Sequence, residues 1–202
     1  MAYMAFQEYT HLLVMPAANR NLMVVVRQER LGLHDVRHIA RRLGGALQHL
    51  HANGMVHCDL KPLNAVRFAD AGAAGAATWR IIDLDAAVQI GCPAGVKISS
   101  GYLPPEMVYI DPATGEAHLK VPSARDVPDD AGVVLASPAF DLWSFGVLIF
   151  LLFTGQDLFA LDIADNFSSP QACRLPAHHK GAALLCLVVL VCYAETHLER
   201  SR

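Results

Sequence analysis

The sequence has no excess of positive charge. Lysine and arginine together number 16, against 19 aspartates and glutamates, and the formal net charge at pH 7 is -3. A protein without a basic field has nothing that attracts a polyanion at long range. We therefore expect neither a nucleic-acid partner nor binding to an anionic membrane surface, and partners must be inferred from local sites.

Paired cysteines are lacking as well. The five cysteines are odd in number and include no Cys-x-x-Cys pair. This spacing argues against a disulfide framework and against a zinc site of the usual kind. Reduced thiols are typical of intracellular proteins, so we expect a cytoplasmic location.

The apolar runs are too short for a membrane span. The two longest, residues 142–153 and 182–194, fall short of the roughly 20 residues that cross a bilayer, so we expect buried core helices. The opening "MAYMAFQEYT" has no basic start and no apolar run, and it predicts no signal peptide. With 53% apolar residues, a chain of 202 residues can bury the core of one domain.

Apolar spacing predicts an α+β fold in which helices dominate. Residues 11–16, "HLLVMP", read as a buried strand, and residues 19–30 as a short helix. Residues 33–53 repeat apolar side chains every three or four positions, as in a long amphipathic helix. "AVRF" and "WRIID" should pair as a hairpin. The Gly- and Ala-rich turn between them lacks the Lys and Ser or Thr pair of a phosphate-binding loop.

The second half of the chain predicts a surface insertion followed by a central helix. Residues 111–136 are rich in prolines and acids and read as the insertion. "SPAFDLWSFGVLIFLLFTG" begins with Ser137 as a cap and Pro138 at the first helical position, and it ends at Gly155. Because this helix is apolar nearly all round, it should lie at the centre of a helical subdomain.

Polar side chains concentrate in "HCDLKPLN", residues 57–64. This segment resembles the catalytic loop of eukaryotic protein kinases, which reads His-Arg-Asp, four residues, then Asn. "IIDLD", "GYLPPE" and "FDLWSFG" follow in the places of the family's Asp-Phe-Gly, Ala-Pro-Glu and Asp-x-Trp-Ser-x-Gly motifs. Four motifs in order and at suitable spacing are far more specific than any one of them.

The resemblance implies ATP-dependent phosphorylation of protein serine or threonine. Asp59 would be the catalytic base and Lys61 would contact the transferred phosphate, while Asn64 and Asp83 would hold two Mg²⁺ ions. Lys61 together with Ser99 is the pattern of the serine/threonine class. Four positions are implied to be structural or to lie on the substrate side: His57, Ser99, Glu106 and Asp141.

Two other interpretations of the loop stand beside this one. Asp, Asn and Lys are common in turns, so the loop could consist of ordinary turn residues. His49, His51 and His57 could also be metal ligands. The three downstream motifs fit independently and favour the kinase interpretation over both.

"HLLVMPAANRNL" resembles the strand and hinge that hold adenine in this family. Met15 would limit the depth of the pocket, and the Pro16 carbonyl and the Ala18 N–H would bond the base edge. Pro16 is acceptable there because only its carbonyl is needed. Val66 would form the floor under adenine. The alternative is an ordinary buried strand and turn.

The resemblance covers residues 9–160, a partial kinase domain, and leaves residues 161–202 as a divergent segment. Fewer than twelve residues precede the hinge, so the glycine-rich loop, its Lys and the helix with the partner Glu do not fit. We expect a kinase-like fold that is mainly the helical C-terminal lobe with the hinge strand. A non-catalytic pseudokinase, acting as an interaction module, is the rival function.

Two substitutions depart from the family pattern. Cys58 replaces the Arg that receives an activation-loop phosphate in many kinases. Asp85 replaces the Gly of Asp-Phe-Gly and lacks its conformational freedom, although Asp tolerates left-handed backbone better than most residues. No Arg partner for Glu106 is evident.

Overall fold

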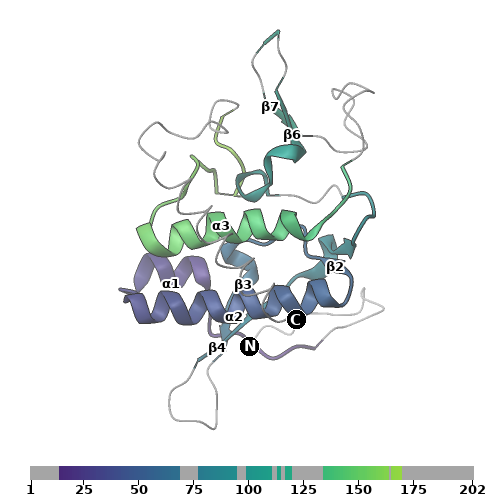
Figure 1. Ribbon diagram of the computed structural model, residues 1–202. Coiled ribbons are helices and arrows are strands. Elements are labelled where there is room, and N and C mark those ends of the chain that lie inside the picture. Colours follow the sequence, from purple (N-terminus) through teal and green to yellow (C-terminus); the bar gives the residue numbers. More distant parts are fainter. Residues whose placement is uncertain are drawn as a thin grey trace, which may run out of the picture.

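The computed structural model describes residues 14–68, 77–94, 99–110, 113–114, 117–119, 134–163 and 165–169. Helices α1 (Leu22–Gln28), α2 (Leu33–Ala52) and α3 (Pro138–Thr154) form the body of this part. Figure 1 shows α3 lying along α1 and α2, with short strands beside them. The mixed content, with helices predominant, confirms the predicted fold class.

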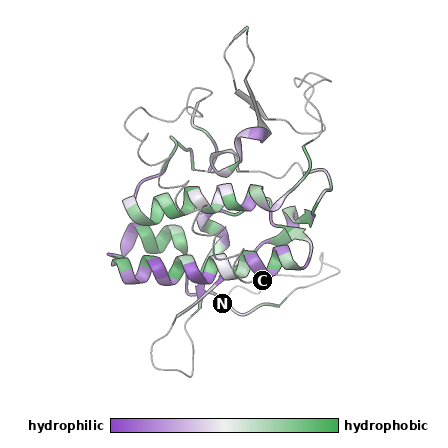
Figure 2. Ribbon diagram, viewed as in Figure 1, coloured by the Kyte–Doolittle hydropathy of each residue, from purple (hydrophilic) through white to green (hydrophobic). Residues whose placement is uncertain are grey.

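Helix α2 is amphipathic as its spacing predicts. Its buried face carries Val36, Ile39, Leu43 and Leu47, which pack into one core with α1, α3 and the sheet. At the N-terminus the carboxylate of Asp35 accepts a hydrogen bond of 2.9 Å from the Gly32 N–H. The helix therefore presents one apolar face to the core and one polar face to solvent, a striping visible in Figure 2.

Helix α3 is buried nearly all round, which confirms its predicted central position. Ser137 is the residue before its first turn, and Pro138 occupies that turn, where its missing N–H is not needed. The Ser137 side chain makes no capping hydrogen bond. Gly155 ends the helix with φ of 69°, a left-handed conformation that glycine adopts without strain.

Three small antiparallel sheets complete the described fold. Strands β1 (Arg20–Asn21), β3 (Ala65–Phe68) and β4 (Thr78–Ile81) form one sheet in the order β1-β3-β4. The other two pair β2 (Met55–Val56) with β5 (Val88–Gln89) and β6 (Val108–Ile110) with β7 (Ala117–Leu119). The β3–β4 pairing confirms the predicted hairpin, whose tip, residues 69–76, lies outside the described residues.

The predicted buried strand before Pro16 is wrong in its described part. Val14 and Met15 are 83% and 68% exposed, and neither belongs to a strand. An apolar run becomes a buried strand only when another element covers it, and none of the described elements covers these two side chains. Residues 11–13 lie outside the described part of the chain.

Several other predictions fall largely or wholly outside the described residues. The apolar run 182–194 and the opening ten residues belong to this group, as does most of the expected insertion 111–136. Where the chain is described, no helix is long and apolar enough to cross a bilayer.

Candidate active site

The loop of residues 57–64 brings an acid, a lysine and an amide into direct contact. It runs from β2 to a 3-10 turn at Pro62–Asn64 that leads directly into β3. Asn64 Nδ2 donates hydrogen bonds to the Asp59 carbonyl, at 2.9 Å, and to Asp59 Oδ2, at 3.2 Å. Lys61 Nζ lies 3.2 Å from the same Oδ2. The short sequence spacing of Asp59, Lys61 and Asn64 within one loop is thus enough to bring their side chains into contact.

The other carboxylate oxygen of Asp59 has no hydrogen-bond partner in the part of the chain that the structure describes. Asp59 is 4% exposed, and its Oδ1 is buried and unbonded. A buried, unpaired carboxylate oxygen is costly, and such groups occur where a ligand or water completes the site. Asp59 is therefore oriented through Oδ2 and retains Oδ1 as an acceptor for an incoming donor.

Lys61 also reaches across to the segment before Tyr102. Its Nζ donates a hydrogen bond of 2.7 Å to Ser99 Oγ, and Ser99 itself is buried. Two residues 38 positions apart in the sequence are thereby joined, as the resemblance implies for the serine/threonine class. One ammonium group links the catalytic loop with the segment expected to face the substrate.

Asp141, at the start of α3, fixes the backbone of this loop through hydrogen bonds. Its fully buried carboxylate accepts the backbone N–H groups of His57, at 2.9 Å, and Cys58, at 3.0 Å. His51 Nε2 lies 2.7 Å from Asp141 Oδ2. Cys58 adopts φ of 64°, a left-handed conformation that aims two successive N–H groups at one carboxylate. Asp141 thus fixes the backbone from which Asp59 projects.

His57 is fully buried, and both of its ring nitrogens have partners. The Asp59 N–H donates to His57 Nδ1 over 3.2 Å, and Nε2 lies 3.1 Å from the Ile82 carbonyl. A ring that accepts at Nδ1 donates at Nε2, so this geometry fits a neutral imidazole. His57 joins the loop to the chain just before Asp83, which accords with a structural role.

Asn64 and Asp83 offer hard oxygen ligands. Asp83 is exposed and adopts φ of 68°, and the preceding Ile82 N–H donates to the Asn64 carbonyl over 2.9 Å. Both hydrogen bonds from Asn64 to Asp59 use Asn64 Nδ2. They do not involve the amide oxygen, Asn64 Oδ1. Magnesium typically takes one or two protein oxygens together with water and phosphate. The donor set therefore fits Mg²⁺.

The left-handed conformation in this region falls on Asp83 rather than on Asp85. Asp85 lies within the 3-10 turn Leu84–Ala86, where glycine's freedom is not needed. The concern that Asp85 would strain the turn is therefore not supported. Asp83 can adopt this conformation because Asp tolerates the left-handed region better than most residues, and Asp85 needs no such tolerance.

The predicted adenine-side residues are only partly brought together. Val66 is buried in β3 and pairs with Asn21 of β1, just beyond the hinge. Met15, Pro16 and Ala18 are exposed. The role of Val66 as the floor under adenine stays a prediction, and no described element covers the side chains of Met15, Pro16 and Ala18.

The segment after α3 packs against the 3-10 turn at Ser100–Tyr102. The Ser100 N–H and Oγ both donate to Asn166 Oδ1, at 3.1 and 3.2 Å, and the Gly101 N–H donates to the Asp165 carbonyl, at 3.1 Å. Asp165 is buried, and desolvation raises the pKa of its carboxyl group. The domain boundary at residue 160 stays a prediction, but the next few residues contribute contacts here.

Glu106 is exposed and makes no ion pair with any residue that the structure describes.

The sequence analysis did not predict His51 as a partner of Asp141, and it did not predict the contacts of Asn166. A signal existed for His51, because it continues the four-residue spacing of Leu43 and Leu47 on the buried face of α2. No comparable pattern marks Asn166.

The protein kinase domain family model matches residues 1–178 of this chain. Together with the four motifs and the geometry above, this shows the class of the protein. The chain belongs to the protein kinase domain family, whose members phosphorylate proteins.

Two of the curated relatives that the chain resembles are named as serine/threonine-protein kinases. The chain is 35% identical over 127 residues to the chloroplastic serine/threonine-protein kinase STN7 of Arabidopsis thaliana, an alignment that covers 56% of this chain and 20% of that protein. It is 32% identical to the mouse serine/threonine-protein kinase SBK1 over 136 residues, 66% of this chain and 27% of the relative. The chain thus spans well under a third of the length of either relative.

A chain in the crystal structure of the yeast RNA Pol II CTD kinase CTDK-1 complex has a similar fold. The TM-score is 0.52 at 18% sequence identity, and the match covers 73% of this chain and 41% of that chain. At this identity the likeness concerns the fold alone, which is that of a partial kinase domain.

Proposed function

We propose that this site catalyses ATP-dependent phosphorylation of serine and threonine residues in proteins. The observation that carries the proposal is the position of Lys61 Nζ, which contacts both Asp59 Oδ2, at 3.2 Å, and Ser99 Oγ, at 2.7 Å, while Asp59 Oδ1 has no partner among the described residues. An intact base and lysine, joined to the substrate-side serine, are what phosphoryl transfer to a hydroxyl requires. The serine/threonine kinases among the relatives support the acceptor class.

The chain's own residues divide the work of the reaction. Asp59 Oδ1 accepts a hydrogen bond from the acceptor hydroxyl, orients its oxygen for attack and takes its proton. Lys61 supplies positive charge beside the attacking group, where the transferred phosphate carries negative charge. Asn64 and Asp83 would hold magnesium, which when bound neutralises phosphate charge. Asp141 keeps the loop in place, so the alignment costs little at the moment of reaction.

A second candidate function is a non-catalytic interaction module. It is favoured by the exposed side chains of Val14 and Met15, which offer an apolar surface beside the hinge. The assembled Asp59, Lys61 and Asn64 oppose it.

We also propose a reducing, intracellular environment, supported by the free thiols of Cys58 and Cys92.

The test is phosphotransfer from magnesium-ATP to a mixed peptide library, with the chain and with a form extended upstream by about one small lobe. Asp59→Asn should lower turnover by at least about 10²-fold with little change in nucleotide affinity. Asp35→Asn, the same change on the exposed surface of α2, is the control. Label should appear on serine and threonine. Equal turnover in the Asp59 variant, or label mainly on tyrosine, would contradict the proposal.

A further inference from the structure

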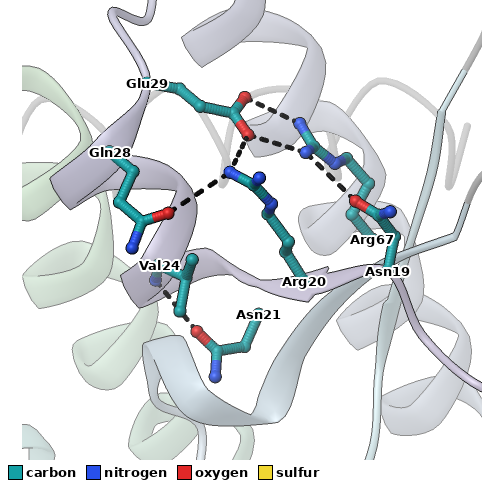
Figure 3. A network of polar contacts seen from close by, with 7 residues as sticks. All are labelled: Asn19, Arg20, Asn21, Val24, Gln28, Glu29 and Arg67. Atoms are coloured by element: carbon teal, nitrogen blue, oxygen red, sulfur yellow. Dashed lines mark hydrogen bonds and ion pairs between the residues drawn. The ribbon is translucent and has the colours of Figure 1, made fainter.

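A group of charged side chains joins the end of α1 to strands β1 and β3 (Figure 3). Arg67 donates to both carboxylate oxygens of Glu29, over 2.7 and 2.8 Å, and Arg20 donates to Glu29 Oε1 over 3.1 Å. Glu29 is the residue at which α1 ends, Arg67 lies in β3 and Arg20 in β1. One carboxylate thus ties three segments together, and we call these three residues the charged clamp.

The charged clamp lies directly beside the segment that is expected to bond adenine. Arg67 Nη2 also donates to Asn19 Oδ1 over 3.3 Å, and the Asn19 N–H donates to the Arg67 carbonyl over 2.8 Å. Asn19 directly follows Ala18 in the chain. Strand β1 then pairs Asn21 with Val66, the residue predicted to form the floor under adenine. Arg67 therefore holds the chain, through its backbone and its side chain, one residue away from a predicted adenine contact.

The backbone pairing at this point is short. Strand β1 has two residues and lies at the edge of its described sheet, so few ladder hydrogen bonds hold it on β3. A bidentate arginine–carboxylate pair fixes the relative orientation of the two groups that form it. The hydrogen bonds from Arg67 hold the pKa of Glu29 below its usual range, so the carboxylate is ionised at neutral pH. The charged clamp therefore supplies an orientation that a strand of two residues holds only loosely.

The fold of α1 does not depend on the charged clamp. Leu22 and Val25 are fully buried in the main core, and Asn21 Oδ1 caps the helix by accepting the Val24 N–H over 2.9 Å. The side chains of the charged clamp, by contrast, are 21–41% exposed. Ion pairs at this exposure contribute only modestly to global stability. Loss of the charged clamp should therefore loosen residues 18–21 without unfolding the chain.

We propose that Glu29 and Arg67 are positioning residues for nucleotide binding. They hold the chain that follows Ala18 on β3, and they thereby orient the Pro16 carbonyl and the Ala18 N–H toward the edge of adenine. Groups that are oriented in advance bind a ligand at a smaller cost in entropy. The catalytic loop is held separately, by Asp141, so the charged clamp acts on ATP affinity and not on the chemical step. This inference rests on the proposed function, and it adds residues that do not touch the nucleotide.

A first experiment needs no nucleotide. Amide hydrogen exchange of the 202-residue chain, followed by NMR, should be several-fold faster at the Asn19 N–H in Arg67→Met, with no change at the Cys58 N–H of the catalytic loop. Arg42→Met is the matched control, because it makes the same change at an exposed position of α2 that has no ion pair among the described residues. An unchanged rate at Asn19, or an equal acceleration at Cys58, would overturn the proposal without bearing on phosphotransfer.

A second experiment measures nucleotide affinity in the form extended upstream by about one small lobe. Arg67→Met should raise the Kd and the KM for magnesium-ATP by about 2- to 10-fold, while kcat and the KM for the peptide stay unchanged. Arg67→Lys, which keeps the charge but not the two-pronged geometry, should restore part of the affinity. Unchanged ATP affinity in Arg67→Met, or an equal loss in kcat, would overturn the proposal.

The same titration separates this inference from the proposed function. A parent protein that binds magnesium-ATP without turnover would contradict the proposed function alone, because the effect of Arg67→Met on the Kd could still be measured. A parent that binds no nucleotide would overturn the predicted adenine contacts of Pro16 and Ala18, and this inference with them.

Discussion

At the scale of single residues, burial and the neighbouring carboxylate of Asp141 control the reactivity of the Cys58 thiol. Its N–H is bonded to Asp141, which holds the side chain in a half-buried position beside two carboxylates. Burial, and then the negative charge of Asp141, raise the pKa of the Cys58 thiol to about 12. Since the thiolate is the nucleophile, the folded protein should protect this cysteine from alkylation.

We therefore expect Cys58 to react with iodoacetamide at pH 8 at least about 10²-fold more slowly in the folded chain than in urea. Peptide mass spectrometry, with Cys92 followed in the same samples, measures both rates. Fast labelling of Cys58 in the folded protein would show that its thiol is not buried beside Asp141 as described.

The Glu29 carboxylate should make stability depend on pH. Its pKa is lowered chiefly by the hydrogen bonds from Arg67, so on acidification the unfolded chain takes up the proton first. The contribution is therefore complete above the ordinary pKa of 4.5 and disappears as the pH falls through the lowered value. We expect Glu29→Gln to cost about 1 kcal/mol at pH 7 and much less near pH 3.

Urea unfolding of four proteins, the parent, Glu29→Gln, Arg67→Met and the double variant, isolates this pair from other losses. A coupling free energy that is the same at both pH values would contradict the assignment.

Single residues also show which contacts of the candidate site could be predicted from the sequence. The contacts among Asp59, Lys61 and Asn64 lie within six positions, so a local motif predicts them. The link from Lys61 to Ser99 was implied by the family resemblance. The role of Asp141 as acceptor for three groups was not foreseen, because it joins segments more than 80 residues apart and leaves no periodic trace.

At the scale of elements, Gly101 sets how closely the segment after α3 can pack. A Cβ built on Gly101 would lie 3.0 Å from the Asp165 carbonyl oxygen and closer still to the Leu161 side chain. Gly45, in the exposed part of α2, has nothing within 4 Å of the same position. The same substitution should therefore have opposite effects at the two sites.

Gly101→Ala should destabilise the chain by about 1–3 kcal/mol, since backbone and side chain must both move. Gly45→Ala should stabilise it by up to about 1 kcal/mol, because alanine restricts the unfolded chain and favours helix. Thermal unfolding of both variants measures the difference. A stable Gly101 variant would mean that Leu161 and Asp165 do not pack on Gly101 as described.

Elements differ in how well their sequences predict them. Helices α2 and α3 can be predicted from their own sequences. Helix α2 shows the repeat of buried residues, and α3 has Pro138 at its start and Gly155 at its end. The strand expected at residues 11–16 rested on a short apolar run, and such a run does not specify what will cover it. Val14 and Met15 are exposed for that reason, whereas the β3–β4 hairpin is covered by α2.

At the scale of the whole molecule, the proposed function requires a nucleotide pocket, and the described residues include the predicted contacts for one side of it. Val66 is buried in β3, while Met15, Pro16 and Ala18 are exposed to solvent. Adenine binds well between two apolar walls, and phosphoryl transfer gains most from polar groups in a site that excludes water. Among the described residues, no element forms the second wall.

The 202-residue chain should therefore bind magnesium-ATP weakly and transfer phosphate very slowly, although its catalytic loop is fully assembled. The exposed apolar side chains beside the hinge should also promote self-association. Calorimetric titration with magnesium-ATP, followed by a phosphotransfer assay, tests the chain against a form extended upstream by about one small lobe. Activity in the extended form alone would agree with a catalytic loop that is assembled but lacks the second wall of the nucleotide pocket. Micromolar binding and robust turnover by the short chain would show instead that Val66, the hinge and the catalytic loop suffice.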